Sequence, residues 1–137
     1  MAFVILKIVT GGIKKWQQYL NKEKHKIFVA YENQNFLGFS ACKEDEELKN
    51  CLYLDSLHVS ETSRGKGVGT KLINTVGNYA YTEGYEHMSI CIVKGNDKAK
   101  RIYEKIGAKY YKDFIDYFGD TESHSQKLIW NNLNCFK

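Results

Sequence analysis

The most informative segment of the chain is the glycine-rich sequence Arg64-Gly65-Lys66-Gly67-Val68-Gly69-Thr70. Three glycines alternate with other residues, and apolar residues at helical spacing follow them from Val68 through Leu72 until Gly84. Glycine lets the backbone approach a ligand and point successive N–H groups at it. The N-terminus of the following helix adds partial positive charge. The turn is therefore predicted to bind phosphate.

Two common phosphate-binding motifs do not fit this turn. A P-loop requires G-x-x-x-x-G-K-[ST], but Ser60 occupies the position of its first glycine. The dinucleotide fingerprint G-x-G-x-x-G also fails, because Thr70 and Leu72 occupy the position of its last glycine in the two available registers. The ligand is therefore predicted to be neither a typical P-loop nucleotide nor a dinucleotide.

Apolar patterns on both sides of the turn predict alternating strands and helices. The strand from Leu52 to Val59, the helix after the turn and the strand from His87 to Val93 imply a parallel pair with a right-handed crossover. The hairpin signal at 32–35 implies antiparallel pairing. We expect an α/β fold with a mixed sheet flanked by helices, and one domain over residues 1–137. Further strands are expected at 3–9, 26–31, 36–42, 108–114 and 125–130, with loops at 43–50 and 119–124 and helices at 13–20 and from Asn96 to Gly107.

Composition excludes several classes of protein. The chain of 137 residues has a formal net charge of +4, and its acidic residues are scattered among the lysines. That mild bias does not indicate a nucleic-acid partner, because no continuous basic run accompanies it. The apolar N-terminal segment lacks the basic leader and cleavage site of a signal peptide. No run approaches the length of a membrane span, so we expect a cytoplasmic protein.

The cysteines and histidines do not have the spacing of metal ligands. Cys42, Cys51, Cys91 and Cys135 form no C-x-x-C pair, and the four histidines are equally dispersed. Free thiols in a reducing compartment are the expected state. No metal cofactor is predicted.

The glycine turn and its flanks resemble a known family. The turn matches [QR]-x-x-G-x-[GA], the pyrophosphate-binding motif of the GNAT superfamily of acetyl-CoA-dependent N-acetyltransferases. The resemblance extends to the preceding strand, 54–59, and to Asn96, Tyr103 and the pair Gly107-Ala108. It is close from Leu52 to about Phe114. It implies a mostly antiparallel mixed sheet whose one parallel strand pair splays apart.

The resemblance implies acetyl-CoA as cosubstrate. The pantetheine arm would lie along the strand at Leu57 and Val59, with backbone donors near Leu57 and His58. Asn96 would contact the cofactor while also capping its helix, and Lys98, Lys100 or Arg101 could reach the 3′-phosphate. The residues assigned to the pyrophosphate are Arg64, Gly65, Lys66, Gly67, Val68, Gly69 and Thr70.

Two residues are expected to move protons. Tyr103 matches the family tyrosine that protonates the leaving thiolate, and a phenol is acidic enough for that step. Alkyl amines are protonated at pH 7, so a base must first remove a proton. Asp55 is the candidate base. It stands where the similar spermidine/spermine acetyltransferases carry a glutamate, and it is expected to share a strand face with Tyr53, Leu57 and Val59. The alternative for Tyr103 is a core residue, and the alternative for Asp55 is a structural ion pair or a surface carboxylate.

The sequence leaves the acceptor open. A small amine, an amino acid, a polyamine and a protein amine all fit an enzyme that acetylates a primary amine by direct attack in a ternary complex. The alternative is a module that senses acyl-CoA without turnover. Pairing of monomers through edge strands near the C-terminus is also open. Candidate acidic residues for the acceptor site are Glu44, Asp45, Glu46, Glu47, Asp113, Asp116, Asp120 and Glu122.

Overall fold

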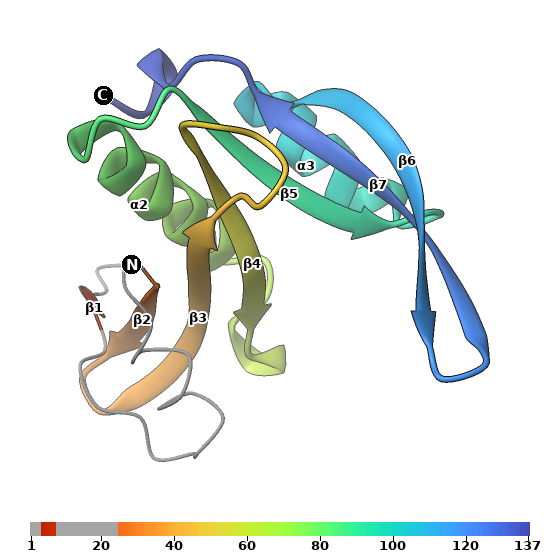
Figure 1. Cartoon of the computed structure of the whole chain (residues 1–137). Coiled ribbons are helices and arrows are strands. Elements are labelled where there is room, and N and C mark those ends of the chain that lie inside the picture. Colours follow the sequence, from red (N-terminus) through yellow and green to blue (C-terminus); the bar gives the residue numbers. More distant parts are fainter. Residues whose placement is uncertain (1–3, 8–24) are drawn as a thin grey trace.

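A computed structural model describes residues 4–7 and 25–137. The helix expected at 13–20 lies outside the described residues. The described strands form one sheet in the order β1-β2-β3-β4-β5-β7-β6 (Figure 1). Its strands are β1 (Val4–Lys7), β2 (Lys26–Glu32), β3 (Asn35–Glu44), β4 (Cys51–Val59), β5 (His87–Val93), β6 (Lys109–Phe118) and β7 (Thr121–Trp130).

The parallel pair predicted from the crossover is present, and it splays apart. Strands β4 and β5 are parallel, and all other neighbouring strands are antiparallel. The β4–β5 pairing runs only from Cys51 opposite His87 to Leu54 opposite Ile90. Beyond that point β4 continues beside β3 as far as Val59, and β5 continues beside β7. The two strands therefore diverge into a fork, which confirms the expected mixed sheet.

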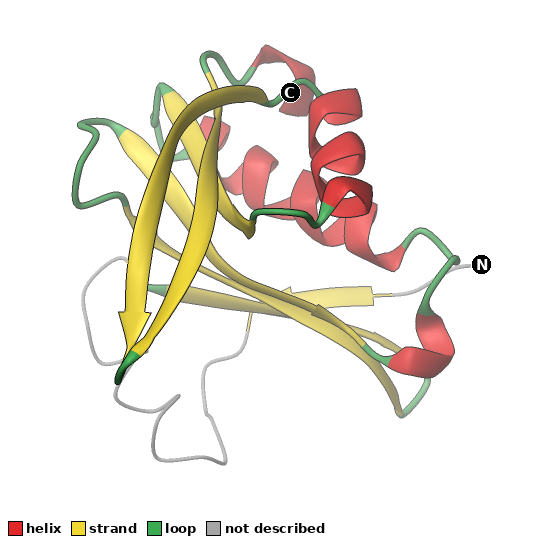
Figure 2. Ribbon diagram, turned by 90° about the vertical axis from the view of Figure 1, so that its right-hand side faces the viewer, coloured by secondary structure: helices red, strands yellow, loops and turns green. Residues whose placement is uncertain are grey.

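The two described helices, α2 (Val68–Thr82) and α3 (Asp97–Ile106), lie on the same side of the sheet (Figure 2). Leu72 and Val76 of α2 are fully buried and join the core that includes Leu52 and Leu54 of β4. This helix covers the strand that leads into the glycine turn. Burial of its apolar face therefore fixes the position of the turn against the sheet.

Close packing at the end of the chain explains a glycine in the middle of α2. A Cβ on Gly77 would lie 2.3 Å from Cγ of Phe136. Phe136 belongs to the 3-10 helix η2 (Asn134–Phe136), and its carbonyl accepts a hydrogen bond from Asn78 Nδ2 at 3.0 Å. Gly77 therefore gives up about 1 kcal/mol of helix propensity relative to Ala so that an aromatic ring can pack against the helix.

The final hairpin is longer than predicted. The expected loop at 119–124 and the strand end at Phe114 are wrong, because β6 and β7 stay paired as far as Phe118 opposite Thr121. Gly119 has a φ of +63° and forms the turn with Asp120. The outer half of the hairpin covers no core, so it lacks the apolar alternation by which a strand is detected in sequence. It projects away from the helices (Figure 1).

Candidate active site

The glycine turn at 64–70, called the phosphate turn below, has the geometry of an anion site. Gly65 and Gly67 have φ of +81° and +80°, a region that favours glycine, and a Cβ on either would meet open space. Gly67 is the N-cap of α2, and no side chain caps the helix there. The first N–H groups of α2 are thus left for a ligand. The side chains of Arg64 and Lys66 are exposed beside them.

The turn lies directly after the open part of β4. A short 3-10 helix, η1 (Glu61–Ser63), connects Val59 to the turn, and Ser60 Oγ donates to Ser63 Oγ at 2.6 Å. Leu57 and Val59 are half-buried and pack against the core, while the side chain of His58 is exposed. The His58 ring stacks on Phe36 with ring centroids 6.4 Å apart. The His58 ring therefore faces the outside, and any role at the fork falls to its backbone.

Asp55 occupies a bulge at the point where the fork opens. The β3–β4 register runs from Ala41 opposite Ser56 to Cys42 opposite Leu54, so Asp55 is the extra residue. Leu57 and Val59 pack on the same core as Leu54. The expectation that Tyr53, Asp55, Leu57 and Val59 share one face is therefore wrong, because the bulge shifts the alternation by one residue between Leu54 and Leu57.

Tyr103 lies on the helix side of the sheet. It is 9% exposed and belongs to the core, and burial raises the pKa of its hydroxyl above the ordinary value of 10.0. The following residues end α3: Gly107 has a φ of +117°, and Ala108 N–H donates to the Tyr103 carbonyl at 3.0 Å. The hydroxyl is therefore protonated at neutral pH and able to donate.

The residues expected near the cofactor 3′-phosphate line the start of α3. Asn96 is the N-cap, and its Oδ1 accepts from Ala99 N–H at 3.3 Å, so the predicted capping role is confirmed. Lys98 and Arg101 are exposed on the same helix. Within residues 4–7 and 25–137, neither side chain forms an ion pair.

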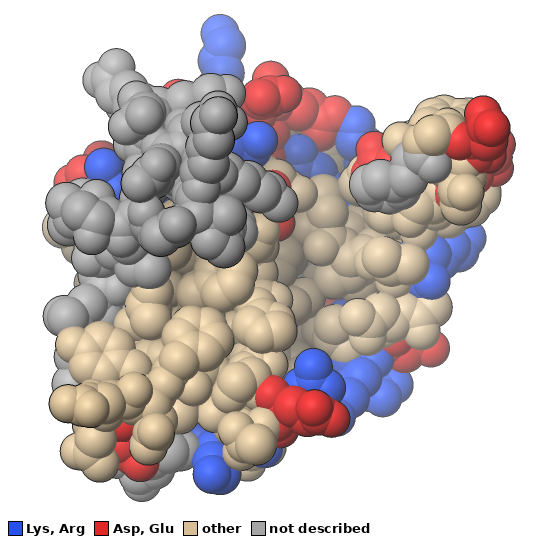
Figure 3. Space-filling model, turned by 90° about the horizontal axis from the view of Figure 1, so that it is seen from below, with Lys and Arg blue, Asp and Glu red and all other residues tan. Residues whose placement is uncertain are grey.

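The opposite face of the sheet carries a pocket of about 410 Å³, called the acceptor-side pocket below. It extends from the β3–β4 loop across the fork to the β6–β7 hairpin. Seen from below, the molecule is hollowed between its main body and the projecting hairpin (Figure 3). The residues that line the acceptor-side pocket include Lys43, Asp45, Glu46, Glu47, Tyr53, Cys91, Phe114, Asp116, Ser125 and Lys127.

Tyr53 and Cys91 both line the acceptor-side pocket beside the end of the β4–β5 pairing. Burial is the main cause that raises the pKa of the Tyr53 hydroxyl and of the Cys91 thiol. The charges of nearby carboxylates act in the same direction.

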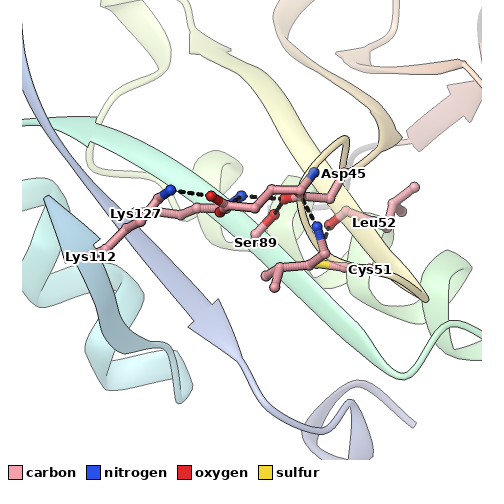
Figure 4. Close-up of polar contacts among 8 residues, drawn as sticks. Asp45, Cys51, Leu52, Ser89, Lys112 and Lys127 are labelled. Atoms are coloured by element: carbon pink, nitrogen blue, oxygen red, sulfur yellow. Dashed lines mark hydrogen bonds and ion pairs between the residues drawn. The ribbon is translucent and has the colours of Figure 1, made fainter. Parts of the chain in front are cut away.

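A charged cluster, buried at Asp45 and Lys127 and exposed at Glu47 and Lys112, forms the floor of the pocket (Figure 4). Lys127 Nζ lies 2.7 Å from Asp45 Oδ2 and 3.1 Å from Glu47 Oε1, and the Lys127 and Asp45 side chains are 9% and 1% exposed. Lys112 pairs with the other Glu47 oxygen. The cluster fastens the β3–β4 loop to the hairpin.

Asp45 is fully satisfied within that cluster. Its Oδ1 accepts from the backbone N–H groups of Glu47 and Leu48 at 2.8 and 2.9 Å, and its Oδ2 accepts from Ser89 Oγ at 2.6 Å. Burial opposes the charged form of Asp45, but Lys127 and these donors outweigh it and lower the carboxyl pKa. Such a buried pair is costly to break, because the remaining charge would lose its compensation.

Sequence reasoning missed the basic half of this cluster. Lys112 and Lys127 are ordinary lysines in sequence, and only their register opposite one another on β6 and β7 brings them together. The one sequence feature that could have revealed Lys127 is the apolar run Leu128-Ile129-Trp130 directly after it. A lysine beside such a buried run needs a partner for its charge.

Most of the acidic candidates for the acceptor site are engaged elsewhere. Glu44 accepts from the Tyr85 hydroxyl at 3.2 Å, and Asp113 accepts from the Tyr110 hydroxyl at 3.1 Å. Neither lines the acceptor-side pocket. Asp45 and Glu47 do, but their charges are matched by lysines. Among the candidates, Glu46 and Asp116 line the pocket without a partner in the described part of the chain.

Among residues 4–7 and 25–137, no group of three His, Cys, Asp or Glu side chains is arranged to hold a metal ion. None of the helices within those ranges is long and apolar enough to cross a membrane. The four cysteines are free thiols.

Comparison with known proteins gives the same fold. N-alpha-acetyltransferase 30 of Schizosaccharomyces pombe is 29% identical over 107 residues, which cover 77% of this chain and 71% of that protein. An IAA acetyltransferase from Bacillus cereus superposes with a TM-score of 0.77 at 18% identity, over 93% of this chain and 98% of that chain. An acetyltransferase from Bacillus subtilis, solved in complex with CoA, gives 0.77 at 12% identity over 95% and 99%.

The fold, the turn and these relatives define an acyltransferase. Residues 8–108 match the acetyltransferase (GNAT) family, which is well over half of the chain. The chain belongs to the acetyltransferase (GNAT) family.

Proposed function

We propose that this chain acts as a single domain that transfers an acetyl group from acetyl-CoA to a primary amine, by direct attack in a ternary complex. The observation that carries the proposal is the fork. Pairing between β4 and β5 stops at Leu54 and Ile90, immediately before Asp55 and directly upstream of the phosphate turn. The acetyl group would lie at this point, between the helix side of the sheet and the acceptor-side pocket.

The cofactor would bind on the helix side. The amides of the phosphate turn would hold its pyrophosphate, because they are uncapped and open to an anion. The free backbone edge of β4 at Leu57 and Val59 would pair with the pantetheine arm. Lys98 and Arg101 would face the 3′-phosphate, with Asn96 between them and the arm. The CoA complex of the Bacillus subtilis relative supports this choice of cosubstrate.

The amine would enter from the acceptor-side pocket. Asp55, directly or through a water, takes one proton from the ammonium group. The amine nitrogen then attacks the thioester carbonyl, and the backbone N–H of Leu57 or His58 stabilises the oxyanion. The carbon–sulfur bond breaks, and the Tyr103 hydroxyl gives its proton to the departing sulfur. The nitrogen, which still carries one proton too many after its attack, releases that proton through solvent, and the Tyr103 oxygen takes up a proton again. Neither step needs a covalent enzyme intermediate, so the cysteines take no part.

Ligand-dependent unfolding and turnover together test the proposal. A ligand present at 100 times its Kd stabilises the folded state by about 2.7 kcal/mol. We expect that shift with acetyl-CoA and CoA but not with ATP or NADH. Mass spectrometry of amines incubated with the protein and acetyl-CoA should then show a gain of one acetyl group. A shift without any acetylated amine would favour an acyl-CoA sensor, and no shift would refute both readings.

A further inference from the structure

Strand β6 forms a long uncovered edge of the sheet. It is the last strand in the sheet order, and within residues 4–7 and 25–137 only β7 pairs with it (Figure 1). It has 10 residues, whereas β1 at the other edge has 4. An edge strand presents unpaired backbone N–H and C=O groups to any strand that approaches it. The chain contains no proline that would interrupt this row of groups.

The side chains of β6 add apolar surface to this edge. Eight large apolar side chains are exposed in the described part of the chain, and four of them lie on β6. These four are Tyr110, Tyr111, Ile115 and Tyr117, of which Tyr117 is 66% exposed. Exposed apolar groups that gather in one place mark a contact surface, whereas scattered ones are ordinary. The strand is therefore suited to bind another polypeptide strand.

The face of β6 toward the acceptor-side pocket carries an ordered set of side chains. Lys112, Phe114 and Asp116 all line that pocket, so they share one face of the strand. Asp113 and Ile115 alternate with them and point to the other face. Along the chain, the pocket face thus presents a cation, an aromatic ring and an anion at equal spacing. Such a series is complementary to its own reverse.

A second β6 strand fits this face in one symmetric register. Two identical antiparallel strands related by a twofold axis bring residue i opposite residue j and residue j opposite residue i, on the same face. With the axis at Phe114, Lys112 of each copy lies opposite Asp116 of the other, and the two Phe114 rings are neighbours. An axis at Lys112, Asp113 or Asp116 would place two like charges opposite each other. An axis at Ile115 would place neither charge of the pocket face opposite its counterpart.

We infer that two copies of this chain pair antiparallel through β6, with the twofold axis at Phe114, so that their sheets become one. Asp116, which has no ion-pair partner within residues 4–7 and 25–137, would pair with Lys112 of the second copy. The Lys112 side chain is 44% exposed beside Glu47, so a second carboxylate can reach it. Tyr117 of each copy would lie beside the tyrosines at the bulge of the other. The second copy would thereby extend the hairpin wall of the acceptor-side pocket.

The association should be weak enough to follow by dilution. One strand pair buries less than the roughly 1,600 Å² of a standard interface, so we expect a Kd of about 10 μM. Sedimentation velocity between about 1 and about 300 μM should therefore show the 15.9 kDa chain passing from monomer to dimer.

Two charge reversals test the register. Asp116→Lys and Lys112→Asp each place like charges opposite one another twice, so each variant alone should dimerise at least about tenfold more weakly than wild type. An equimolar mixture of the two should regain the dimer, because both pairs between the different chains are again Lys opposite Asp. Glu83→Lys is the control, since it changes the net charge as Asp116→Lys does but lies at the end of α2, far from β6 (Figure 1). It should leave the dimer intact.

Three results would overturn the inference. The first is a wild-type chain that stays monomeric up to about 300 μM. The second is a dimer that Asp116→Lys weakens no more than Glu83→Lys does, and the third is a mixture of the two reversals that stays monomeric. Acetyl transfer is measured by turnover, so none of these results bears on the proposed function.

Discussion

The phosphate turn draws its ligand-facing groups from the consecutive residues 64–70, whereas the acceptor-side pocket is assembled from the β3–β4 loop and strands β4 to β7. The turn presents backbone N–H groups, whose position depends on glycine and on the start of one helix. The pocket presents side chains, whose position depends on a buried ion-pair cluster. A short motif of consecutive residues suits the phosphate turn, whose ligand would be the same in every turnover. A pocket built from several elements can change its acceptor through single substitutions on any of them.

The largest effect is expected between the two regions, at Tyr103. Tyr103→Phe keeps the buried ring and removes only the hydroxyl, so kcat should fall by roughly 10²–10⁴. Acetyl-CoA affinity and thermal stability should stay close to wild type. Steady-state kinetics with the best amine, beside cofactor titration, checks this. An unchanged kcat would leave Tyr103 as a core residue and remove it from the mechanism.

Lys127→Met tests the acceptor-side pocket, the region that is assembled from distant segments of the chain. The change leaves the buried Asp45 carboxylate without its cation, so the free energy of unfolding should fall by about 3 kcal/mol. Lys112→Met is the matched control. Its pair with Glu47 is 44% and 39% exposed, and its loss should cost about 1 kcal/mol or less. Denaturant unfolding of both variants checks the difference.

The double variant Asp45→Asn/Lys127→Met sharpens the same test. It removes the uncompensated charge, so it should recover part of the stability lost in Lys127→Met. If the two single lysine variants are equally stable, the cluster does not hold the pocket together.

Gly67→Glu tests the phosphate turn, the region that is formed by consecutive residues. A glutamate there would put a negative charge in the open space at the N-terminus of α2, where it would repel a pyrophosphate, so acetyl-CoA affinity should fall by about 100-fold or more. Gly84→Glu is the control, since Gly84 follows the other end of α2, has a φ of +89° and also faces open space. Both variants carry the strain of a side chain at positive φ.

Calorimetric titration with acetyl-CoA should therefore separate two variants of similar stability. Equal affinities in Gly67→Glu and Gly84→Glu would mean that the turn is only a connection between β4 and α2.

The smallest effect is expected at the close contact that holds the chain terminus on α2. Gly77→Ala should improve helix propensity by about 1 kcal/mol, yet the overlap with Phe136 should make the variant less stable by about 1 kcal/mol net. In a Phe136→Ala background the same change should become stabilising. A double-mutant cycle in denaturant measures this reversal. A stabilising Gly77→Ala in the wild-type chain would contradict the packing.

Short-range sequence patterns were sufficient to predict the elements on the cofactor side of the candidate site. The glycines of the turn, the Asn96 cap and the helix carrying Tyr103 follow from short-range patterns, and the structure places each on the expected element. The bulge at Asp55 was missed because it is a property of the pairing between β3 and β4. The hairpin was predicted too short because its outer half buries nothing.

The parallel crossover, the phosphate turn and the resemblance to acetyltransferases could all be predicted from the sequence, because each depends on residues within one or two consecutive elements. Which acidic residues are already paired could be learned only from the folded chain. Glu47 and Lys127 are 80 residues apart in sequence and 3.1 Å apart in space. Whether a charge is neutralised depends on such distances, since electrostatic interaction in a buried site follows position in space and not order along the chain.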